Sequence, residues 1–234
     1  MFKVPPEVNP NMSTASKLRI SDVDSCPSSA PHELTRSETY FLGVESVIRG
    51  LPFALIDRVA DVLWHAYLED RTVYVLGNGG SAALASHCAC DLGKGTVVNG
   101  NRRFRVLALT DNLPLMTAWA NDASYEEVFA EQLATFVAKK DIVLAISGSG
   151  NSPNVLRALK VAKAAGAFTI GLTGFQGGRM KPLCDLCVIV PSDNMQIIED
   201  LHVGVNHAIF CAVRARMCNS VVNTSARDKV DASA

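Results

Sequence analysis

The sequence predicts an α/β fold in which helices cover both faces of a parallel sheet. Short apolar runs at 73–76 and 141–146 have the aliphatic and β-branched composition of strands that are buried on both faces. A Gly- and Ser-rich turn follows each run, at 77–81 and 147–152, and a segment with helical periodicity follows each turn. Repeated strand–turn–helix units of this kind are typical of parallel sheets with helices on either side.

The chain is long enough for one domain with a sizeable core, because it has 234 residues of which 48% are hydrophobic. We assign this domain to residues 35–217. Residues 1–34 are rich in Pro, Ser, Asn and Thr, and they are predicted to form a disordered N-terminal extension. Residues 218–234 are polar and are predicted to form a flexible tail.

The elements of the predicted domain follow one another in a regular order. Two helices, at 35–50 and 52–70, precede the first strand, and the second of them carries an apolar stripe. The first strand, 73–76, leads into a helix of small residues at 82–92. We expect the remaining elements to be a strand at 105–109, a short helix through Trp119, a turn at Asn121-Asp122, a helix at 125–138, a strand at 141–146, a helix at 153–165, a strand at 169–172, a short helix near Met180, a strand at 186–190 and a long helix at 193–217.

Composition argues against several classes of partner. The formal net charge of -1 gives no general attraction to nucleic acid or to a membrane surface. No apolar run is long enough to span a bilayer, and the first residues do not have the pattern of a signal peptide. We therefore expect a cytoplasmic protein with a small-molecule partner, and neither a nucleic acid nor a membrane partner.

The seven cysteines fit the same compartment, since most of them stand in apolar surroundings, as buried thiols do in a reducing cytosol. Cys184 and Cys187 form a C-x-x-C motif, which is typical of redox sites and of one half of a zinc site. No second C-x-x-C accompanies it, and it stands at the entry to an apolar strand. We therefore interpret this pair as packing residues.

The turn at 77–81 predicts an anion site. It reads Gly77, Asn78, Gly79, Gly80 and Ser81, and the glycines let the backbone turn sharply and approach a ligand closely. The turn lies between the carboxyl end of a strand and the start of a helix, where free N–H groups and the helix dipole favour negative charge.

The second turn offers hydroxyl groups at a helix start. Ser147, Ser149 and Ser152 supply three hydroxyls, and backbone amides such as that of Gly148 add further donors for phosphate oxygens. A serine that caps the following helix is the alternative interpretation. Neither a P-loop nor a complete dinucleotide fingerprint is present, because Ala82 stands where the third glycine of G-x-G-x-x-G belongs.

Four residues form a candidate metal or acid/base group. His87 and Asp91 are four residues apart and so share one face of a helix. The last helix adds Glu199 and His207, and imidazole and carboxylate are good zinc ligands. Glu199 and His207 are eight residues apart, which is about 12 Å along a straight helix. The two side chains therefore cannot both bind one ion comfortably. Either Glu199 precedes the helix, or a neighbouring subunit intervenes, or only one of the two is a ligand; Glu199 with His202 is a competing pair.

Taken together, these motifs resemble the sugar isomerase (SIS) domain and, within it, the phosphoheptose isomerases. The resemblance covers about residues 38–217. It implies a five-stranded parallel sheet flanked by helices, a flavodoxin-like three-layer sandwich that assembles as a homotetramer. It also implies interconversion of sedoheptulose 7-phosphate and D-glycero-D-manno-heptose 7-phosphate, for bacterial heptose biosynthesis, with one zinc ion in each subunit.

The resemblance also implies roles for individual residues. It places zinc ligands at His87, Asp91, Glu199 and His207, and catalytic roles at Asp91, Glu199 and His207. It places substrate contacts at a larger set: Asn78, Gly79, Gly80, Ser81, Asp91, Asn121, Asp122, Ser147, Gly148, Ser149, Ser152 and Glu199.

Three positions depart from the family pattern, which has Glu at the position of Asp91, Gln at that of Glu199 and Thr at that of Gly148. Aldose–ketose isomerisation needs a base near C1 and C2 and an acid or metal that stabilises the enediolate oxygen. Asp91 is one methylene shorter than Glu, and a misplacement of about 1 Å can cost about a hundredfold in rate. We therefore expect Asp91 or Glu199 to be the base, with His207 as its partner, or else a related phosphosugar as substrate.

Two other classes of protein share this scaffold. SIS proteins that bind the bacterial replication initiator tend to lack the acidic residue after the first histidine and the final histidine, whereas Asp91 and His207 are both present here. Phosphosugar-sensing regulators carry a helix-turn-helix before the SIS domain, and residues 1–34 are too short and too rich in Pro and Ser for one. The residues therefore favour an enzyme.

Overall fold

The computed structural model describes the backbone of residues 34–231 and the side chains as far as residue 220. The predicted N-terminal extension, residues 1–34, falls outside the described residues except for its last one. The compact unit that carries the fold begins at Ser37.

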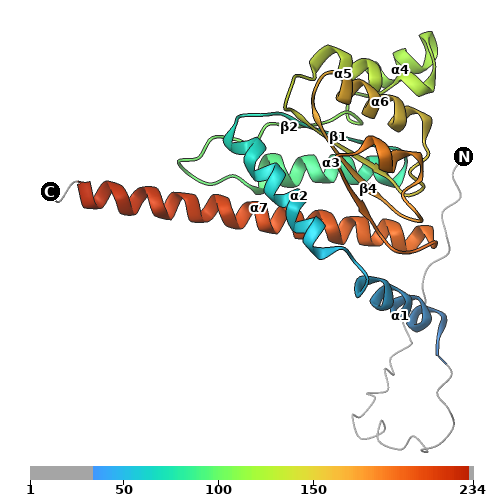
Figure 1. Ribbon diagram of the computed structural model, residues 1–234, viewed down its shortest axis with the longest axis horizontal. Coiled ribbons are helices and arrows are strands. Elements are labelled where there is room, and N and C mark those ends of the chain that lie inside the picture. The colour runs from blue at the N-terminus through green and yellow to red at the C-terminus, as the bar shows by residue number, and fades with distance from the viewer. Residues whose placement is uncertain (1–33, 232–234) are drawn as a thin grey trace, which may run out of the picture. The chain divides into compact units, whose positions relative to one another are not determined.

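Five parallel strands form one sheet in the order β2-β1-β3-β4-β5 (Figure 1). This confirms the predicted fold class. Every residue of the two central strands β1 and β3 is buried, as their uninterrupted apolar sequences require. The strands are β1 (Val73–Gly77), β2 (Val106–Ala108), β3 (Ile142–Ser147), β4 (Phe168–Thr173) and β5 (Leu186–Ile189).

Helices cover both faces of the sheet. Successive residues of a strand point to opposite faces, so each strand contributes side chains to the core on both sides. Val73 and Val75 point to the face covered by α2 (Phe53–Leu68), α3 (Gly80–Cys90) and α7 (Met195–Asp231). Tyr74 and Leu76 point to the other face. That face is covered by α4 (Leu113–Asp122), α5 (Ala130–Phe136) and α6 (Pro153–Ala164) (Figure 1).

The register of the central strands brings the two Gly/Ser turns together. Gly77, the last residue of β1, pairs with Ile146, which is followed by Ser147 at the end of β3. Both turns therefore leave the sheet at the same edge and from neighbouring strands, which is where ligands bind in open parallel sheets.

Two predicted elements were wrong. Asn121-Asp122 is not a turn, because both residues belong to the last turn of α4. The segment 125–138 is not one helix but a short 3₁₀ turn, η3 (Tyr125–Glu127), followed by α5. This break turns Val128 and Phe129, which are adjacent in sequence, both into the core.

Two helices end differently from the prediction. After Cys90, α3 widens into a π-helical turn, η2 (Asp91–Gly95), a form that is common at functional sites. The ring of Phe210 fills the space beside Gly95, since a Cβ there would lie 2.8 Å from ring atoms. The last helix, α7, continues past Met217, the predicted end of the domain, to Asp231.

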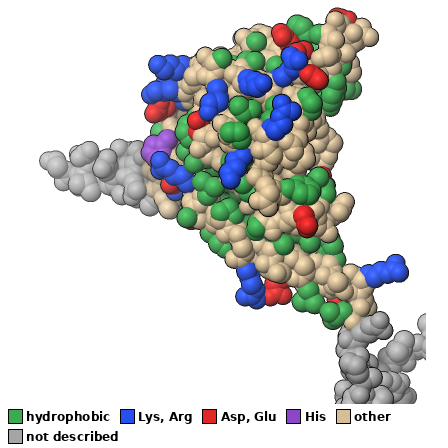
Figure 2. Space-filling view, turned by 45° about the vertical axis from the view of Figure 1, so that its right-hand side comes forward, with side chains coloured by type: hydrophobic (Ala, Val, Ile, Leu, Met, Phe, Trp, Pro, Cys, Tyr) green, Lys and Arg blue, Asp and Glu red, His purple; other side chains and the backbone are tan. Residues whose placement is uncertain are grey.

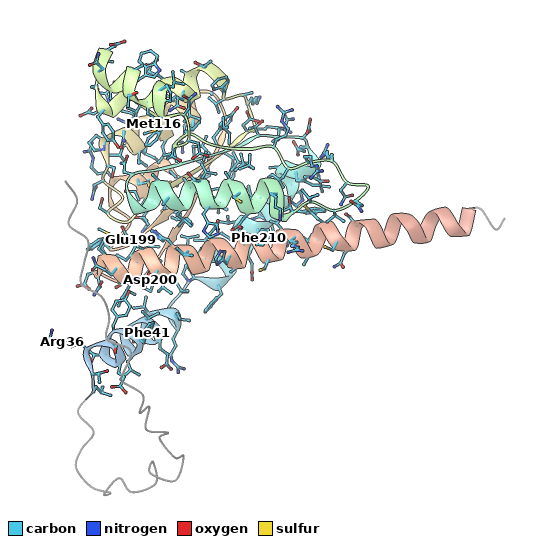
Figure 3. All side chains as sticks on the ribbon, turned by 180° about the vertical axis from the view of Figure 1, so that it is seen from behind. Arg36, Phe41, Met116, Glu199, Asp200 and Phe210 are labelled. Atoms are coloured by element: carbon cyan, nitrogen blue, oxygen red, sulfur yellow. The ribbon has the colours of Figure 1, made fainter. Side chains whose placement is uncertain are left out.

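The first helix, α1 (Arg36–Ile48), has no buried residue, although its sequence is apolar. It contacts the start of α7, where the hydroxyl of Tyr40 donates to Asp200 Oδ2 at 2.5 Å. Figure 3 labels Asp200 on α7 and Phe41 on α1. Other apolar side chains on it face outward, and Phe41 is 67% exposed.

Surface composition and helix length give two further observations. On the face in Figure 2, Lys and Arg side chains are separated by apolar and polar ones. Among the helices of the described chain, none is by itself long and apolar enough to cross a bilayer; α1 and α2, bent by 71° at their junction, meet those criteria only as a pair.

Candidate active site

The turn between β1 and α3 is shaped by its glycines. A Cβ on Gly77 would lie 2.7 Å from the Cβ of Ser81, so only glycine fits where the chain leaves the strand. Gly79 has a φ of 55°, which glycine adopts without strain. No side chain caps α3 in the described part of the chain. The amino end of α3 therefore presents backbone donors at the edge of the sheet.

Asn78 is held in place by two neighbours. Its amide exchanges two hydrogen bonds of 2.9 Å with Asn154, a buried residue in the first turn of α6. The hydroxyl of Tyr125 also donates to Asn78 Oδ1, at 3.0 Å. The two Gly/Ser turns are thus tied to each other through Asn78 and Asn154.

The second turn, between β3 and α6, brings two of its serine hydroxyls together. Ser147 and Ser152 lie with their Oγ atoms 3.3 Å apart, and the Oγ of Ser149 accepts from the N–H of Asn151 at 3.2 Å. The side chain of Ser152 makes no capping bond to α6. The alternative in which this serine serves as a helix cap is therefore not what the structure has.

A short 3₁₀ helix, η4 (Gly178–Leu183), supports this second turn. The N–H of Met180 donates to the carbonyl of Gly150 at 2.9 Å, and the N–H of Arg179 donates to Asn151 Oδ1 at 3.0 Å. The shape of the turn thus depends on where η4 lies.

Gly148 lies against the start of α7. A Cβ at this position would be 2.5 Å from the sulfur of Met195. Met195 therefore fills the space that a larger residue at 148 would occupy, which gives a structural reason for glycine at a position where the resemblance implies threonine.

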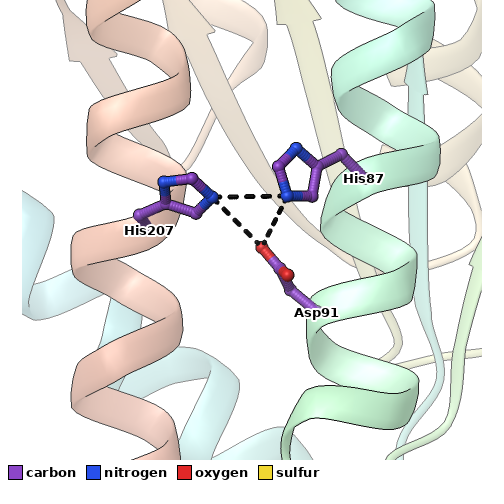
Figure 4. A group of neighbouring side chains, drawn as sticks. All are labelled: His87, Asp91 and His207. Carbon is purple, nitrogen blue, oxygen red and sulfur yellow. Dashed lines mark hydrogen bonds and ion pairs between the residues drawn. The ribbon is translucent and has the colours of Figure 1, made fainter.

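Three predicted ligands meet between α3 and α7 (Figure 4). The Nε2 atoms of His87 and His207 are 3.3 Å apart, and Asp91 Oδ2 lies 3.5 Å from the first and 3.8 Å from the second. The three ligand atoms all lie within 4.8 Å of one another. The histidine side chains are about half exposed, whereas Asp91 is 18% exposed.

These separations fit a tetrahedral zinc site. Ligand atoms about 2.1 Å from a tetrahedrally bound zinc ion lie about 3.4 Å from one another. The three observed separations are 3.3, 3.5 and 3.8 Å. Two imidazoles and one carboxylate also form the donor set of catalytic zinc sites, which keep a position open for substrate or water.

Asn206 supports this cluster, and the sequence did not point to it. Its side chain is buried and donates to Asp91 Oδ2 at 3.0 Å. Ligands in metal sites are commonly oriented by such hydrogen bonds. The available signal was an amide side chain one residue before His207.

Glu199 is not part of the cluster. It lies two helical turns before His207 on α7, near Asp200 (Figure 3), and its carboxylate oxygens are 3.4 and 3.5 Å from where a Cβ on Gly80 would be. No hydrogen bond or ion pair to Glu199 is present within residues 34–220. Of Glu199 and His207, only His207 lies beside His87 and Asp91 of the same chain.

A small pocket of ≈ 190 Å³ lies beside Glu199, where α7 passes the start of α3. It is lined by Gly80, Ser81, Leu84, Glu199, Asp200, His202 and Val203. The imidazole of His202 is 1% exposed, and neither ring nitrogen has a hydrogen-bond partner of normal geometry among the described residues. Burial lowers the pKa of His202, and a weaker interaction with the backbone of Thr173 acts in the opposite direction. His202 is therefore a neutral residue of this pocket and not a ligand in the cluster.

Asn121 and Asp122 lie at the end of α4 and hydrogen-bond to each other. Both are exposed, and Asn121 Nδ2 donates to Asp122 Oδ1 at 2.8 Å. A larger cavity, of ≈ 480 Å³, contains none of the predicted site residues and lies at the opposite edge of the sheet, where Ile142 and Phe168 begin their strands.

Comparison with known proteins agrees with this fold. A family model described as the SIS domain matches residues 46–174. A protein of Aliarcobacter butzleri named phosphoheptose isomerase is 43% identical over 66% of this chain and 81% of its own length. The phosphoheptose isomerase of Rhodospirillum rubrum is 39% identical over 70% of this chain and 87% of its own length. The solved structure of the phosphoheptose isomerase of Neisseria gonorrhoeae matches with a TM-score of 0.72 at 26% identity, over 77% of this chain and 97% of that one. The chain belongs to the SIS-domain family of phosphoheptose isomerases.

Proposed function

We propose that this protein is a phosphoheptose isomerase that interconverts sedoheptulose 7-phosphate and D-glycero-D-manno-heptose 7-phosphate. The relatives named above support this reaction. The observation that carries it is that one helix, α3, has a Gly-rich anion site at its start and two members of the His/Asp cluster near its end. A sugar phosphate can use both groups at once, the anion site for its phosphate and the cluster for oxygens of the sugar.

We place the phosphate at the two Gly/Ser turns. The hydroxyls of Ser147, Ser149 and Ser152 and the backbone amides that begin α3 and α6 supply many donors in a small arc, as three phosphate oxygens require. We place further substrate contacts at the turn residues Asn78, Gly79, Gly80, Ser81 and Gly148 and at Asn121 and Asp122, whose helix precedes the Tyr125 that bonds to Asn78.

The length of α3 suits a long sugar phosphate. His87 follows Gly80 by seven residues, which is about 10 Å along a helix axis. An extended seven-carbon chain with phosphate at one end can reach from the turns toward the cluster. Short phosphosugars would leave one of the two groups without its part of the substrate.

We assign the proton transfer between C1 and C2 to Glu199. Its carboxylate lies against the Gly-rich turn, at a small pocket, and no side chain described in the structure neutralises it. Asp91, the other candidate, already has the Asn206 amide and two imidazoles around one oxygen. A free carboxylate is the better base, and we assign the proton exchange with the sugar oxygen to His207, two helical turns farther along α7.

We propose that His87, Asp91 and His207 hold one zinc ion. When bound, zinc would polarise the sugar's carbonyl and hydroxyl oxygens and stabilise negative charge on them. The chain's own residues fix where this happens, because α3 and α7 each contribute ligands and Asn206 holds the carboxylate between them.

We propose that the protein assembles as a homotetramer in the cytoplasm. Exposed apolar side chains on α1 and a groove of ≈ 270 Å³ support an assembly through this face. The groove is lined by Ile48, Leu51, Phe53, Ile56, Asp57, Leu201, Gly204, Val205 and Ala208. Free thiols at the described cysteines fit a reducing compartment.

Incubation of the purified protein with sedoheptulose 7-phosphate, followed by NMR, tests the reaction. We expect formation of the aldose, loss of conversion on addition of a chelator, and recovery with zinc. Tight binding of the sugar phosphate without conversion would instead support a phosphosugar-sensing role, and the absence of both would refute the proposed function.

A further inference from the structure

Cys184 directly follows η4, and Cys187 is the second residue of β5. The chain bends at Asp185, between them, and this bend brings both sulfurs to the same side of the neighbouring strand β4. A Cβ on Gly171 would lie 2.8 Å from the sulfur of Cys184 and 3.3 Å from that of Cys187. Glycine at this position leaves the room that the two thiols share.

The two thiols are unlike the other cysteines among the described residues. Both are half-buried, and their sulfurs share the space beside Gly171. Cys88 is buried, and burial raises its pKa to about 12, whereas Cys90, Cys211 and Cys218 are exposed.

The electrostatics distinguish the members of the pair. The hydrogen bond from Cys184 and the charge of Lys181 lower the pKa of Cys187, although burial opposes this. The same hydrogen bond and burial raise the pKa of Cys184, with a smaller opposing effect from Lys163 and a reinforcing one from Asp185. The lowered pKa makes Cys187 the member of the pair that forms a thiolate more readily and so attacks first.

This pair is joined to the active site through η4. Cys184 follows the last residue of η4 directly. The start of η4 holds the second Gly/Ser turn, through the N–H of Met180 on the Gly150 carbonyl and the N–H of Arg179 on Asn151. A displacement of Cys184 is therefore transmitted to the turn that we assign to the phosphate.

We propose that Cys184 and Cys187 are a reactive dithiol, which a low-molecular-weight disulfide such as oxidised glutathione converts into an intramolecular disulfide that loosens the turn 147–152. This reverses the interpretation of the C-x-x-C motif as packing alone. The site does not depend on the proposed isomerase activity.

The reaction balances through two exchanges. The Cys187 thiolate attacks one sulfur of the oxidised glutathione, forms a mixed disulfide and releases one glutathione thiolate. Cys184 then loses its proton and attacks the sulfur of Cys187, which releases the second glutathione. Two electrons pass from the cysteine pair to glutathione, whose two thiolates take up the two protons that the cysteines lost. The new bond is about 2 Å long and ties Cys184, which directly follows η4, to Cys187 in β5.

The test uses the full-length protein in glutathione buffers of graded oxidation. Mass spectrometry after alkylation is expected to show the joint loss of both thiols in the peptide that contains Cys184 and Cys187. Hydrogen exchange in 147–152 and at the Met180 amide is expected to rise about tenfold in the oxidised protein. Cys184→Ser and Cys187→Ser should abolish both effects, and Cys90→Ser should preserve them.

Two outcomes would overturn the proposal. One is glutathione attached to the exposed cysteines while Cys184 and Cys187 stay reduced. The other is a disulfide between Cys184 and Cys187 with unchanged exchange in 147–152, which would remove the link to the turn. Neither readout uses substrate turnover, so failure here is separate from failure of the isomerase assignment.

Discussion

The side-chain amide of Asn206 donates a hydrogen bond to Asp91 Oδ2 at 3.0 Å, and this is the same oxygen that lies 3.5 and 3.8 Å from the Nε2 atoms of His87 and His207. One carboxylate oxygen thus has three neighbours, two on α7 and one on α3. Because Asn206 is buried, with 5% of its surface exposed, its amide is fixed by the packing of α7. It therefore sets the direction in which Asp91 presents this oxygen to the histidines.

Asn206→Leu is expected to weaken zinc binding by about ten- to a hundredfold, the usual cost of removing a hydrogen bond that orients a ligand. Competition with a chromogenic chelator measures this without any assay of turnover. The thermal unfolding of the metal-free variant serves as the control for folding. Zinc affinity equal to that of the wild type would show that Asn206 has no part in the metal site.

The pH dependence of stability is expected to contain a contribution from His202. Burial lowers the pKa of its folded-state imidazole, so the unfolded chain takes up a proton first as the pH falls below the ordinary value of about 6.5. Stability from this residue is complete above that pH and is lost below it. In urea unfolding of the metal-free protein, His202→Gln should lose less stability between pH 7.5 and 5.5 than the wild type. An equal or larger loss in the variant would contradict this origin.

Gly77→Ala is expected to destabilise the protein by about 1–3 kcal/mol, since the new Cβ would lie 2.7 Å from both the Cβ and the carbonyl oxygen of Ser81. Gly204→Ala is the matched control, because nothing lies within 4 Å of a Cβ at this position on α7, and alanine favours a helix over glycine by about 0.5–1 kcal/mol. Urea unfolding should move in opposite directions for the two. A neutral Gly77→Ala would mean that the turn has room to relax.

The two carboxylates are expected to have exchanged duties relative to the usual family pattern. Glu199→Gln alone removes the proposed base, whereas the double substitution Asp91→Glu with Glu199→Gln restores the pattern that the resemblance implies. We expect the double variant to recover at least ten times the turnover of Glu199→Gln at saturating substrate. If it is as slow as the single variant, the exchange is not the reason for the two departures.

Much of the fold follows from local patterns in the sequence. The apolar runs of β1 and β3 are long and unbroken because both of their faces are covered, and the turns after them are marked by glycines and serines. The prediction of a single helix at 125–138 was wrong because tertiary packing outweighed helical periodicity, and Val128 and Phe129 are both buried in the core. The turn expected at Asn121-Asp122 failed because α4 continues through both residues to its C-cap at Ala123.

The candidate site was predictable in its residue types but not in its grouping. His87 and Asp91 share a helix face, so their meeting follows from spacing alone. His207 joins them and Glu199 does not. This difference depends on how α7 packs against α3, which cannot be predicted from a local sequence pattern. The same applies to Asn206 and to Asn154, which contact predicted site residues from other helices.

The measurement that tests the central claim most directly is turnover of sedoheptulose 7-phosphate in deuterated water, followed by NMR, for the wild type, Glu199→Gln and Asp91→Asn, with the zinc affinity of each measured alongside. We expect deuterium at C2 of the aldose from the wild type. We expect Glu199→Gln to bind zinc normally but to turn over at least about a hundredfold more slowly, as for loss of a general base, and Asp91→Asn to lose zinc. Full turnover by Glu199→Gln, or no conversion by the wild type, would contradict the account.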